Sequence, residues 1–192
     1  MPEHNTDAVW QFMSDELQFV ERKLQADEAY RTSNCVTSPK HIPEFGEGTP
    51  GADYVIRPGG YLVVRNSRNK FAVVSTPRGF FLPGGGQEES ETAAQAAVRE
   101  ANEECGLIVT LGELLGTADE LVFASAEEQY FRKRCVFFSA ELVSWTGGGE
   151  SDHDLIWMSA DEAATRLTHK SQAWAVKLAQ HLSADYADHT DC

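Results

Sequence analysis

The sequence predicts an α/β (α+β) protein in which a mixed β-sheet lies between helices. Three observations lead to this fold class. Short stretches rich in β-branched and aromatic residues alternate with helical patterns along the chain. An alanine-rich helical pattern follows a glycine turn near the middle of the chain. Hydrophobic residues make up 42% of the 192 residues, which is ordinary for one globular domain plus an extension.

Residues 1–50 are expected to form an N-terminal helix and linker extension. Apolar residues recur at helical spacing from Thr6 to Tyr30, and Phe12 and Phe19 add a second apolar side. A helix with two apolar sides needs two surfaces to bury them, so it either packs on its own domain or forms a homodimer contact. Residues 32–51 contain closely spaced prolines and glycines and are interpreted as an irregular linker.

The main domain is expected to span residues 51–185, with a flexible polar tail at 186–192. Four polar residues at 66–69 are typical of a hairpin turn between two strands. A glycine-rich acidic loop is expected at 146–154. The predicted strands are residues 54–57, 61–65, 71–75, 80–82, 108–117, 119–123, 130–142 and 155–158, and the helices near the C-terminus are residues 160–167 and 171–182.

The charge and the cysteines limit the classes of function. A net charge of -14 argues against a basic nucleic-acid surface, so no nucleic-acid partner is expected. An anionic substrate would need metal ions or local arginines to bind. The 4 cysteines are scattered, which indicates neither a disulfide framework nor a zinc site and favours reduced thiols in the cytoplasm. We expect no secretion signal and no membrane-spanning segment.

A helix is predicted between residues 93 and 105. Thr92 is a good N-cap, and Gln95 can complete a capping box. Gly106 stands where a left-handed residue commonly ends a helix. The apolar stripe consists mostly of small side chains, so the helix is expected to lie close to a sheet. The stripe residues are Ala94, Ala97, Val98, Ala101 and Cys105.

Three glutamates form an acidic arc on this helix: Glu100, Glu103 and Glu104. Their mutual repulsion costs a few tenths of a kcal/mol per like-charged pair. A solvated helix face is one interpretation. Against it, no lysine is interleaved with the arc, and Arg99 is the one cation in reach, for which Glu91 and Glu103 both compete. A divalent cation would convert the repulsion into binding, because hard ions prefer oxygen ligands.

The glycine turn before the helix is a second feature that favours the binding of a metal ion or a phosphate. Residues 83–86 read Pro-Gly-Gly-Gly and can adopt backbone angles closed to other residues. A diphosphate or a metal ion can therefore approach the main chain near a helix N-terminus. This makes Gly84 a candidate metal ligand through its main chain, and Gly85 and Gly86 candidate substrate-binding residues.

Together, these residues resemble the signature of the Nudix hydrolase family, G-x5-E-x7-R-E-U-x-E-E-x-G-U, with U a bulky aliphatic residue. Every charged and glycine position matches, and Ala101 at the first U position is the one departure. The resemblance implies an αβα sandwich and hydrolysis of a nucleoside diphosphate linked to another moiety, by water attack on phosphorus. It also implies that the three glutamates bind Mg²⁺ or Mn²⁺ and that Arg99 and Glu91 form a supporting ion pair. The matching positions are Gly85, Glu91, Arg99, Glu100, Glu103, Glu104, Gly106 and Leu107.

Members of the family often bring a further acidic group from a loop, as an extra metal ligand or as a general base. Glu150 is the first candidate, and Glu127 and Glu128 are the second. For any single one of them, a solvated loop residue is the more ordinary interpretation. His153 is interpreted as an ordinary loop histidine and is not included among the catalytic candidates.

Several cations are candidates for binding a distal phosphate. Arg78 lies just before the strand that enters the glycine turn. Arg132 and Arg134 alternate onto one face of a strand, with Lys133 on the other face. The alternative is that these are surface cations that balance an acidic protein.

Three functions therefore stay open. The first is a metal-dependent pyrophosphohydrolase acting on a small nucleotide. The second is a non-catalytic domain that senses a nucleotide metabolite, against which the intact signature weighs. The third is an RNA-end pyrophosphohydrolase, which the net charge disfavours.

Overall fold

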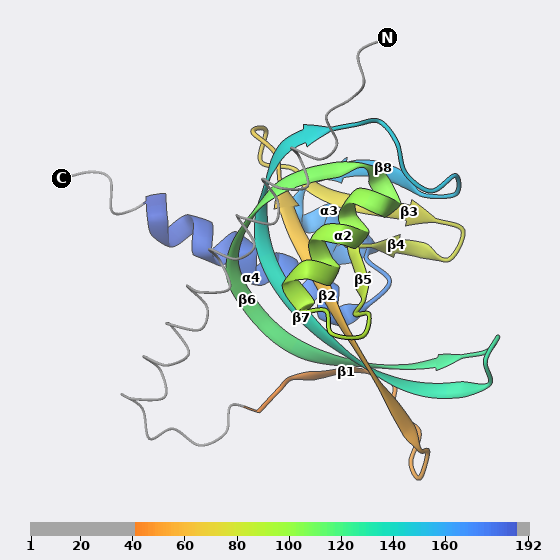
Figure 1. Cartoon of the computed structure of the whole chain (residues 1–192). Coiled ribbons are helices and arrows are strands. Elements are labelled where there is room, and N and C mark those ends of the chain that lie inside the picture. Colours follow the sequence, from red (N-terminus) through yellow and green to blue (C-terminus); the bar gives the residue numbers. More distant parts are fainter. Residues whose placement is uncertain (1–40, 188–192) are drawn as a thin grey trace.

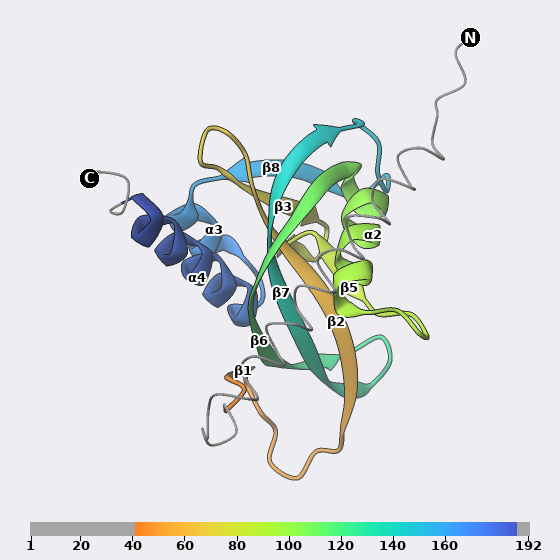
Figure 2. The same ribbon diagram turned by 60° about the vertical axis from the view of Figure 1, so that its left-hand side comes forward.

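The computed structural model describes residues 41–187 of the chain, so the predicted N-terminal helix and the last residues of the tail lie outside the described part. An 8-stranded mixed sheet forms the centre. Helix α2 covers one face of this sheet, and helices α3 and α4 cover the other (Figures 1 and 2). The expected αβα sandwich with a mixed sheet is confirmed.

The strands follow the order β1-β6-β7-β2-β3-β4, with β5 paired to β2 and β8 paired to β3. The pairs β1–β6 and β2–β7 are parallel, and the others are antiparallel. The strands are β1 Glu44–Gly46, β2 Tyr54–Arg65, β3 Phe71–Thr76, β4 Gly79–Phe81, β5 Gly84–Gly86, β6 Leu107–Ala124, β7 Gln129–Trp145 and β8 Asp154–Met158. The helices are α2 Ala93–Cys105, α3 Ala160–Arg166 and α4 Lys170–Ala187.

Strand β2 is continuous where two strands, 54–57 and 61–65, were predicted. The intervening glycines pair with the glycine strand β5, Gly59 with Gly86 and Gly60 with Gly85. A Cβ atom on Gly60 would clash with the carbonyl oxygen of Ala93, at the start of α2. These glycines therefore permit a close helix–sheet contact and do not interrupt the strand.

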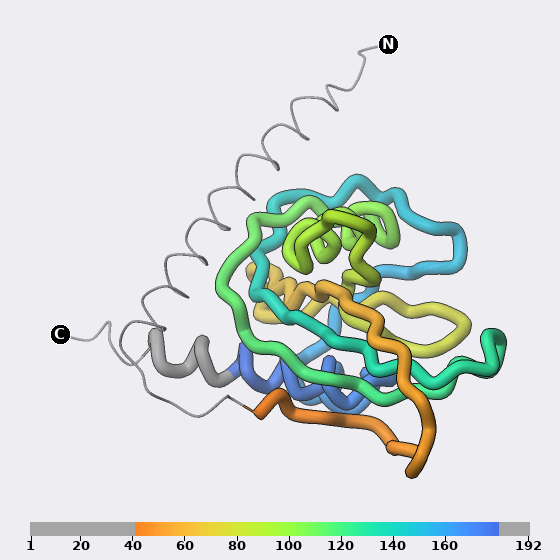
Figure 3. The backbone as a smooth tube through the Cα atoms, turned by 60° about the horizontal axis from the view of Figure 1, so that its bottom comes forward, coloured from red at the N-terminus to blue at the C-terminus, as the bar shows by residue number. Residues whose placement is uncertain are grey.

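Three further elements differ from the prediction. Strand β6 joins the predicted strands 108–117 and 119–123, with register shifts in its first half. Residues 44–46, within the expected irregular linker, form strand β1 beside β6, as Figure 3 shows in orange and green. The ring of Phe45 lies 6.0 Å from that of Trp174 on α4, so a tertiary contact fixes this short strand. Helix α4 also continues to Ala187, beyond the predicted end at residue 182.

Helix α2 has the predicted bounds and caps. The Thr92 hydroxyl accepts a hydrogen bond from the Gln95 amide, the Gln95 side chain accepts one from the Thr92 amide, and Gly106 is left-handed at φ 66°. Its small apolar residues are buried against the sheet. Within residues 41–187, no helix combines the length and the apolar character needed to cross a bilayer.

Candidate active site

The glycine strand β5 lies directly beneath the acidic arc of α2. Gly84 has φ +130°, and a Cβ atom on it would clash with the carbonyl oxygen of Gly60. A Cβ atom on Gly85 would lie 2.6 Å from the carboxyl carbon of Glu100. Gly84 therefore requires glycine for its backbone angles and for its close contact with β2, and a side chain on Gly85 would displace the Glu100 carboxylate.

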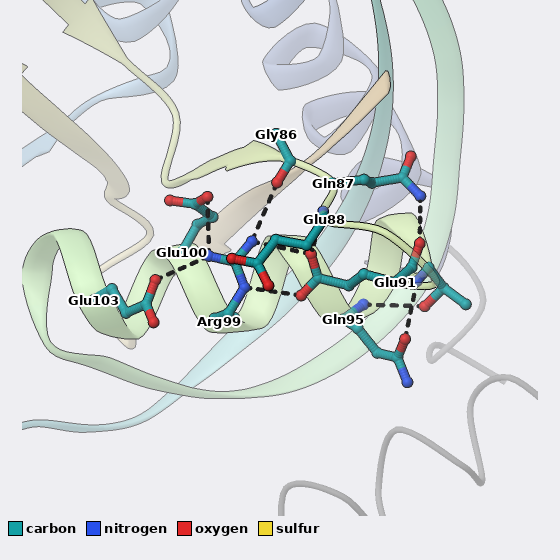
Figure 4. A network of polar contacts seen from close by, with 9 residues as sticks. Gly86, Gln87, Glu88, Glu91, Gln95, Arg99, Glu100 and Glu103 are labelled. Carbon is teal, nitrogen blue, oxygen red and sulfur yellow. Dashed lines mark hydrogen bonds and ion pairs between the residues drawn. The ribbon is translucent and has the colours of Figure 1, made fainter. Parts of the chain in front are cut away.

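Arg99 organises the acidic arc (Figure 4). Its Nε and Nη2 atoms donate to the two carboxylate oxygens of Glu91 at 2.8 and 2.9 Å. Its Nη1 atom donates to Glu100 at 3.0 Å and to Glu103 at 2.9 Å. Nη2 also donates to the carbonyl oxygen of Gly86 at 3.1 Å. The expected ion pair between Arg99 and Glu91 is present, and it ties α2 to the glycine strand.

Two of the three glutamates are desolvated. The side chains of Glu100 and Glu104 are 23% and 19% exposed, whereas that of Glu103 is 52% exposed. Burial, together with the charge of Glu100, raises the pKa of Glu104 to about 7, although the hydrogen bond from the Gly84 amide opposes the rise. Burial likewise raises the pKa of Glu100. A carboxylate that is buried without a full countercharge prefers to be neutral, so the structure leaves these two groups in need of a cation.

The donors present here fit a divalent ion. Mg²⁺ and Mn²⁺ prefer carboxylate and carbonyl oxygens, and the acidic arc supplies three carboxylates beside main chain that carries no side chains. The amide of Gly84, the predicted main-chain ligand, donates to Glu104 Oε2 at 3.3 Å, so the two residues are adjacent.

The loop between β7 and β8 brings another acidic group to α2. The amide of Glu150 donates to the carbonyl oxygen of Glu104 at 3.1 Å, which fixes this loop at the end of α2. The structure therefore places Glu150, the first candidate outside the signature, beside the acidic arc.

His153 joins this loop to the arc, although the sequence analysis did not include it among the catalytic candidates. Its side chain is only 9% exposed. Its Nε2 atom lies 3.7 Å from Glu104 Oε1, and its Nδ1 atom lies 3.2 Å from Glu150 Oε2 and 2.9 Å from Asp152 Oδ1. The ligand atoms of Glu150, Asp152 and His153 lie within 4.8 Å of one another. The three-residue spacing between Glu150 and His153 was the sequence signal that could have indicated this contact.

The second candidates for the loop acid lie elsewhere. Glu127 accepts a hydrogen bond from Arg57 at 2.8 Å, and both side chains are about half-exposed. Glu128 has φ 49° in the same turn at the tip of β6 and β7. Among the described residues, neither has a hydrogen bond or ion pair with α2.

The candidate phosphate-binding arginines have different surroundings. Arg132 and Arg134 lie on one face of β7, as expected, and both bind the buried carboxylate of Asp119. Arg132 also contacts Glu44. Asp119 has a pKa lowered by these hydrogen bonds, Arg134 first, so the cluster is internally compensated. Arg78 is exposed in the turn between β3 and β4, and its side chain has no ion pair with any residue in the range 41–180.

The fold and this arrangement of glutamates define a class of protein. The family model of the NUDIX domain matches residues 49–182, which is more than half of the chain. The chain therefore belongs to the NUDIX domain family, and the prediction of a Nudix phosphoanhydride hydrolase is confirmed.

Solved structures with a similar fold include three from bacteria. A NUDIX hydrolase from Nitrosomonas europaea has a TM-score of 0.55 at 20% identity, over 66% of this chain and 90% of that one. The E. coli dihydroneopterin triphosphate pyrophosphohydrolase has a TM-score of 0.55 at 21% identity, and the match covers 64% of this chain and 95% of that one. An ADP-ribose pyrophosphatase from Streptococcus suis has a TM-score of 0.51 at 19% identity, and the match covers 66% of this chain and 91% of that one. These likenesses concern the fold.

Proposed function

We propose that this protein is a metal-dependent pyrophosphohydrolase that cleaves a phosphoanhydride bond in a small nucleoside diphosphate derivative. The observation that carries the proposal is the convergence of two desolvated glutamates, Glu100 and Glu104, on a strand made only of glycine. Glu103 would complete the set of ligands for Mg²⁺ or Mn²⁺, with the main chain of Gly84 as a further ligand. When bound, such an ion neutralises the phosphate oxygens and the leaving oxygen.

The residues of the chain position the reacting groups. Arg99 holds Glu100 and Glu103 against each other through its Nη1 atom, so their carboxylates are arranged before a substrate arrives. The main chain of Gly85 and Gly86 leaves room for the diphosphate, because no side chain projects from it.

Glu150 is the proposed general base. A water oxygen attacks phosphorus, the anhydride P–O bond breaks with its electron pair on the leaving phosphate, and Glu150 accepts the water proton. His153 positions Glu150, since its Nδ1 atom lies 3.2 Å from that carboxylate and its ring is nearly buried. A rigid histidine between Glu104 and Glu150 fixes the base relative to the acidic arc.

The names of the similar structures support the substrate class. They include enzymes named for dihydroneopterin triphosphate, for Ap4A (from C. elegans) and for ADP-ribose. We carry over only what these names share, a small phosphorylated metabolite. An RNA end is the weaker candidate, because the net charge of -14 repels a polyanion.

We also propose a cytoplasmic location, with a homodimer contact through the N-terminal helix. Cys105 and Cys135 are free and buried, which fits a reducing compartment. A mass measurement in solution tests the dimer.

The direct test is product release from a panel of nucleotides with Mg²⁺ and with EDTA. We expect turnover only with the metal, and its loss in Glu104→Gln and Glu103→Gln. The control is Glu113→Gln, an exposed acid on β6, which should keep wild-type turnover. Full turnover in the two variants of the acidic arc would refute the proposed site.

A further inference from the structure

A second charged cluster lies on the face of the sheet that α4 covers. Its centre is Lys133 on β7, whose Nζ atom lies 3.3 Å from Nε2 of His169, just before α4. In the register of the sheet, Lys133 is directly opposite Glu120 on β6. The Glu120 carboxylate is engaged elsewhere, because it accepts a hydrogen bond from the Ser171 amide at 2.8 Å and lies 4.0 Å from Nδ1 of His169.

Lys133 is therefore a half-buried cation that makes no ion pair with Glu120, the acid opposite it. Within residues 41–180, whose side chains the structure describes, no carboxylate oxygen forms an ion pair with its Nζ atom at 4.0 Å or less. Burial lowers the pKa of Lys133, and the positive charges of Arg78 and Arg57 lower it further, although Glu120 opposes them. Burial and the charge of Lys133 lower the pKa of His169 to about 4, so its ring is neutral near pH 7. Arg78 comes near the same imidazole, because it precedes Gly79, where a Cβ atom would clash with Oγ1 of Thr168, the residue before His169.

The opposite face of β7 shows how this chain compensates cations where it can. There Arg132 and Arg134 both donate to the carboxylate of Asp119 at 2.9 to 3.1 Å. On the α4 face, Arg57 has an exposed partner in Glu127, whereas Lys133 and Arg78 have no ion pair among the described residues. An uncompensated, desolvated cation is costly unless an anion binds it.

This cluster lies close to the glycine strand. The ring of Phe81 lies 5.3 Å from that of His169, and Phe81 precedes Gly84 by three residues. Three residues span at most about 10 Å, so the main chain of Phe81, whose ring contacts His169, lies within about 10 Å of Gly84 at the candidate metal site. Two hydrogen bonds between Phe80 and Thr168 hold this arrangement.

A second connection runs through the sheet. Lys133 precedes Cys135 by two residues on the same face of β7, Cys135 is opposite Gly59, and Gly59 pairs with Gly86 of the glycine strand. Tyr61, two residues after Gly59 on β2, pairs with Gly84 at the other end of the glycine strand.

We propose that Lys133 and Arg78, with the imidazole of His169 beside them, form an anion-binding subsite for a phosphate group of the substrate that is not the group being cleaved. This inference rests on the proposed function. It narrows the substrate class to nucleoside diphosphate derivatives that carry an additional phosphate. That phosphate is either the far end of a longer polyphosphate chain or a monoester on the second moiety.

The first test measures the binding of pyrophosphate to the protein in EDTA by isothermal titration calorimetry. It therefore requires neither a metal ion nor turnover. Lys133→Met removes the charge and keeps the unbranched stem, and Lys177→Met, an exposed site on α4, is the matched control. We expect Lys133→Met to weaken pyrophosphate binding on the order of tenfold or more, and Lys177→Met to leave it unchanged. No binding by the wild type, or equal binding by Lys133→Met, overturns the subsite.

The folded state of the variant is checked by its melting temperature. Loss of a cation without an anionic partner should leave the melting temperature unchanged or raise it, whereas a packing role would lower it and contradict the proposal. Arg78→Gln provides a second variant, on an exposed turn where unfolding is not expected. It should weaken pyrophosphate binding by roughly threefold or more, and unchanged binding counts against the subsite.

The second test compares paired substrates with Mg²⁺. ATP against ADP reports a distal phosphate, and NADPH against NADH reports a phosphate monoester. We expect the phosphate-rich member of one pair to have the lower KM, and Lys133→Met to remove that difference with little change in kcat. No difference in either pair overturns the proposal. If the wild type cleaves no nucleotide at all, the proposed function fails, while the calorimetry still decides the subsite.

Discussion

Arg99 offers a quantitative test of how the acidic arc is held. The substitution Arg99→Met removes the guanidinium and keeps most of the stem. Five hydrogen bonds are lost, two to Glu91, one each to Glu100 and Glu103, and one to the carbonyl oxygen of Gly86. Their individual values do not add, because Glu103 is half-exposed and returns to water.

The loss in the free energy of unfolding on Arg99→Met depends mainly on Glu91. Its side chain is 13% exposed and that of Arg99 is 21% exposed, so the substitution leaves a largely buried carboxylate without its partner. Breaking a buried pair in this way costs about 3–5 kcal/mol, and the residual exposure of both groups points to the lower end. We therefore expect the free energy of unfolding at pH 7 to fall by about 3 kcal/mol.

The stability difference between wild type and Arg99→Met should also depend on pH, in a direction that can be checked. Hydrogen bonds from Arg99 lower the pKa of Glu91 below its ordinary value. A lowered pKa stabilises the folded state above the unfolded value of about 4.3, and this stabilisation is lost as the pH falls through the lower folded value. The difference between wild type and Arg99→Met should therefore shrink below about pH 4.

Urea denaturation in EDTA at pH 7 and in acid measures both effects. The control is Glu127→Gln, which breaks the exposed pair with Arg57 and should cost about 0–1 kcal/mol. A loss below about 1 kcal/mol for Arg99→Met, or a loss that does not depend on pH, would refute the reasoning.

Three further predictions concern the same site. Gly85→Ala places a Cβ atom 2.6 Å from the Glu100 carboxyl carbon. Because that carboxylate can move away, we expect only a small loss of stability. We expect the affinity for Mn²⁺, measured by titration, to fall about 10- to 100-fold. Glu104→Gln removes a carboxylate whose pKa burial raises to about 7. A raised pKa destabilises the folded state as the pH rises above the unfolded value of about 4.3, so in EDTA the variant should be more stable than wild type by about 1–3 kcal/mol at pH 8 and equal to it at about pH 4. It should also lose activity with Mg²⁺. Equal stability at both pH values would contradict this assignment. His153→Gln should lower Mn²⁺ affinity or turnover about 10- to 100-fold, and wild-type values for both would remove its positioning role.

Local signals in the sequence were sufficient for helix α2 and its caps. The N-cap, the capping box and the C-terminal glycine are all set by residues within four positions of one another, and all are present. The competition of Glu91 and Glu103 for Arg99 was also predictable, because helical spacing alone brings Glu103 to Arg99.

Long-range pairing was harder to predict. The break expected at Gly59 and Gly60 is absent, because those glycines serve a contact with α2 and β5 that no local pattern reveals. Strand β1 is fixed by β6, more than seventy residues further along the chain, and three residues are too few for a recognisable strand pattern.

The same limit applies to the residues around the site. The alternation of β7 placed Lys133 opposite to Arg132 and Arg134, and this is confirmed. That Lys133 meets His169, 36 residues further on, depends on how α4 packs on the sheet. The contact of His153 with Glu104 likewise depends on the docking of the β7–β8 loop.

The most direct measurement is Mn²⁺ binding followed by electron paramagnetic resonance at pH 7.5, with and without a nucleotide, in the wild type and in Glu100→Gln and Glu104→Gln. If desolvated carboxylates hold the ion, the wild type takes up Mn²⁺ and each variant loses most of that uptake while remaining folded. Wild-type protein that takes up no Mn²⁺ even with nucleotide, or variants that take up as much as the wild type, would contradict the account.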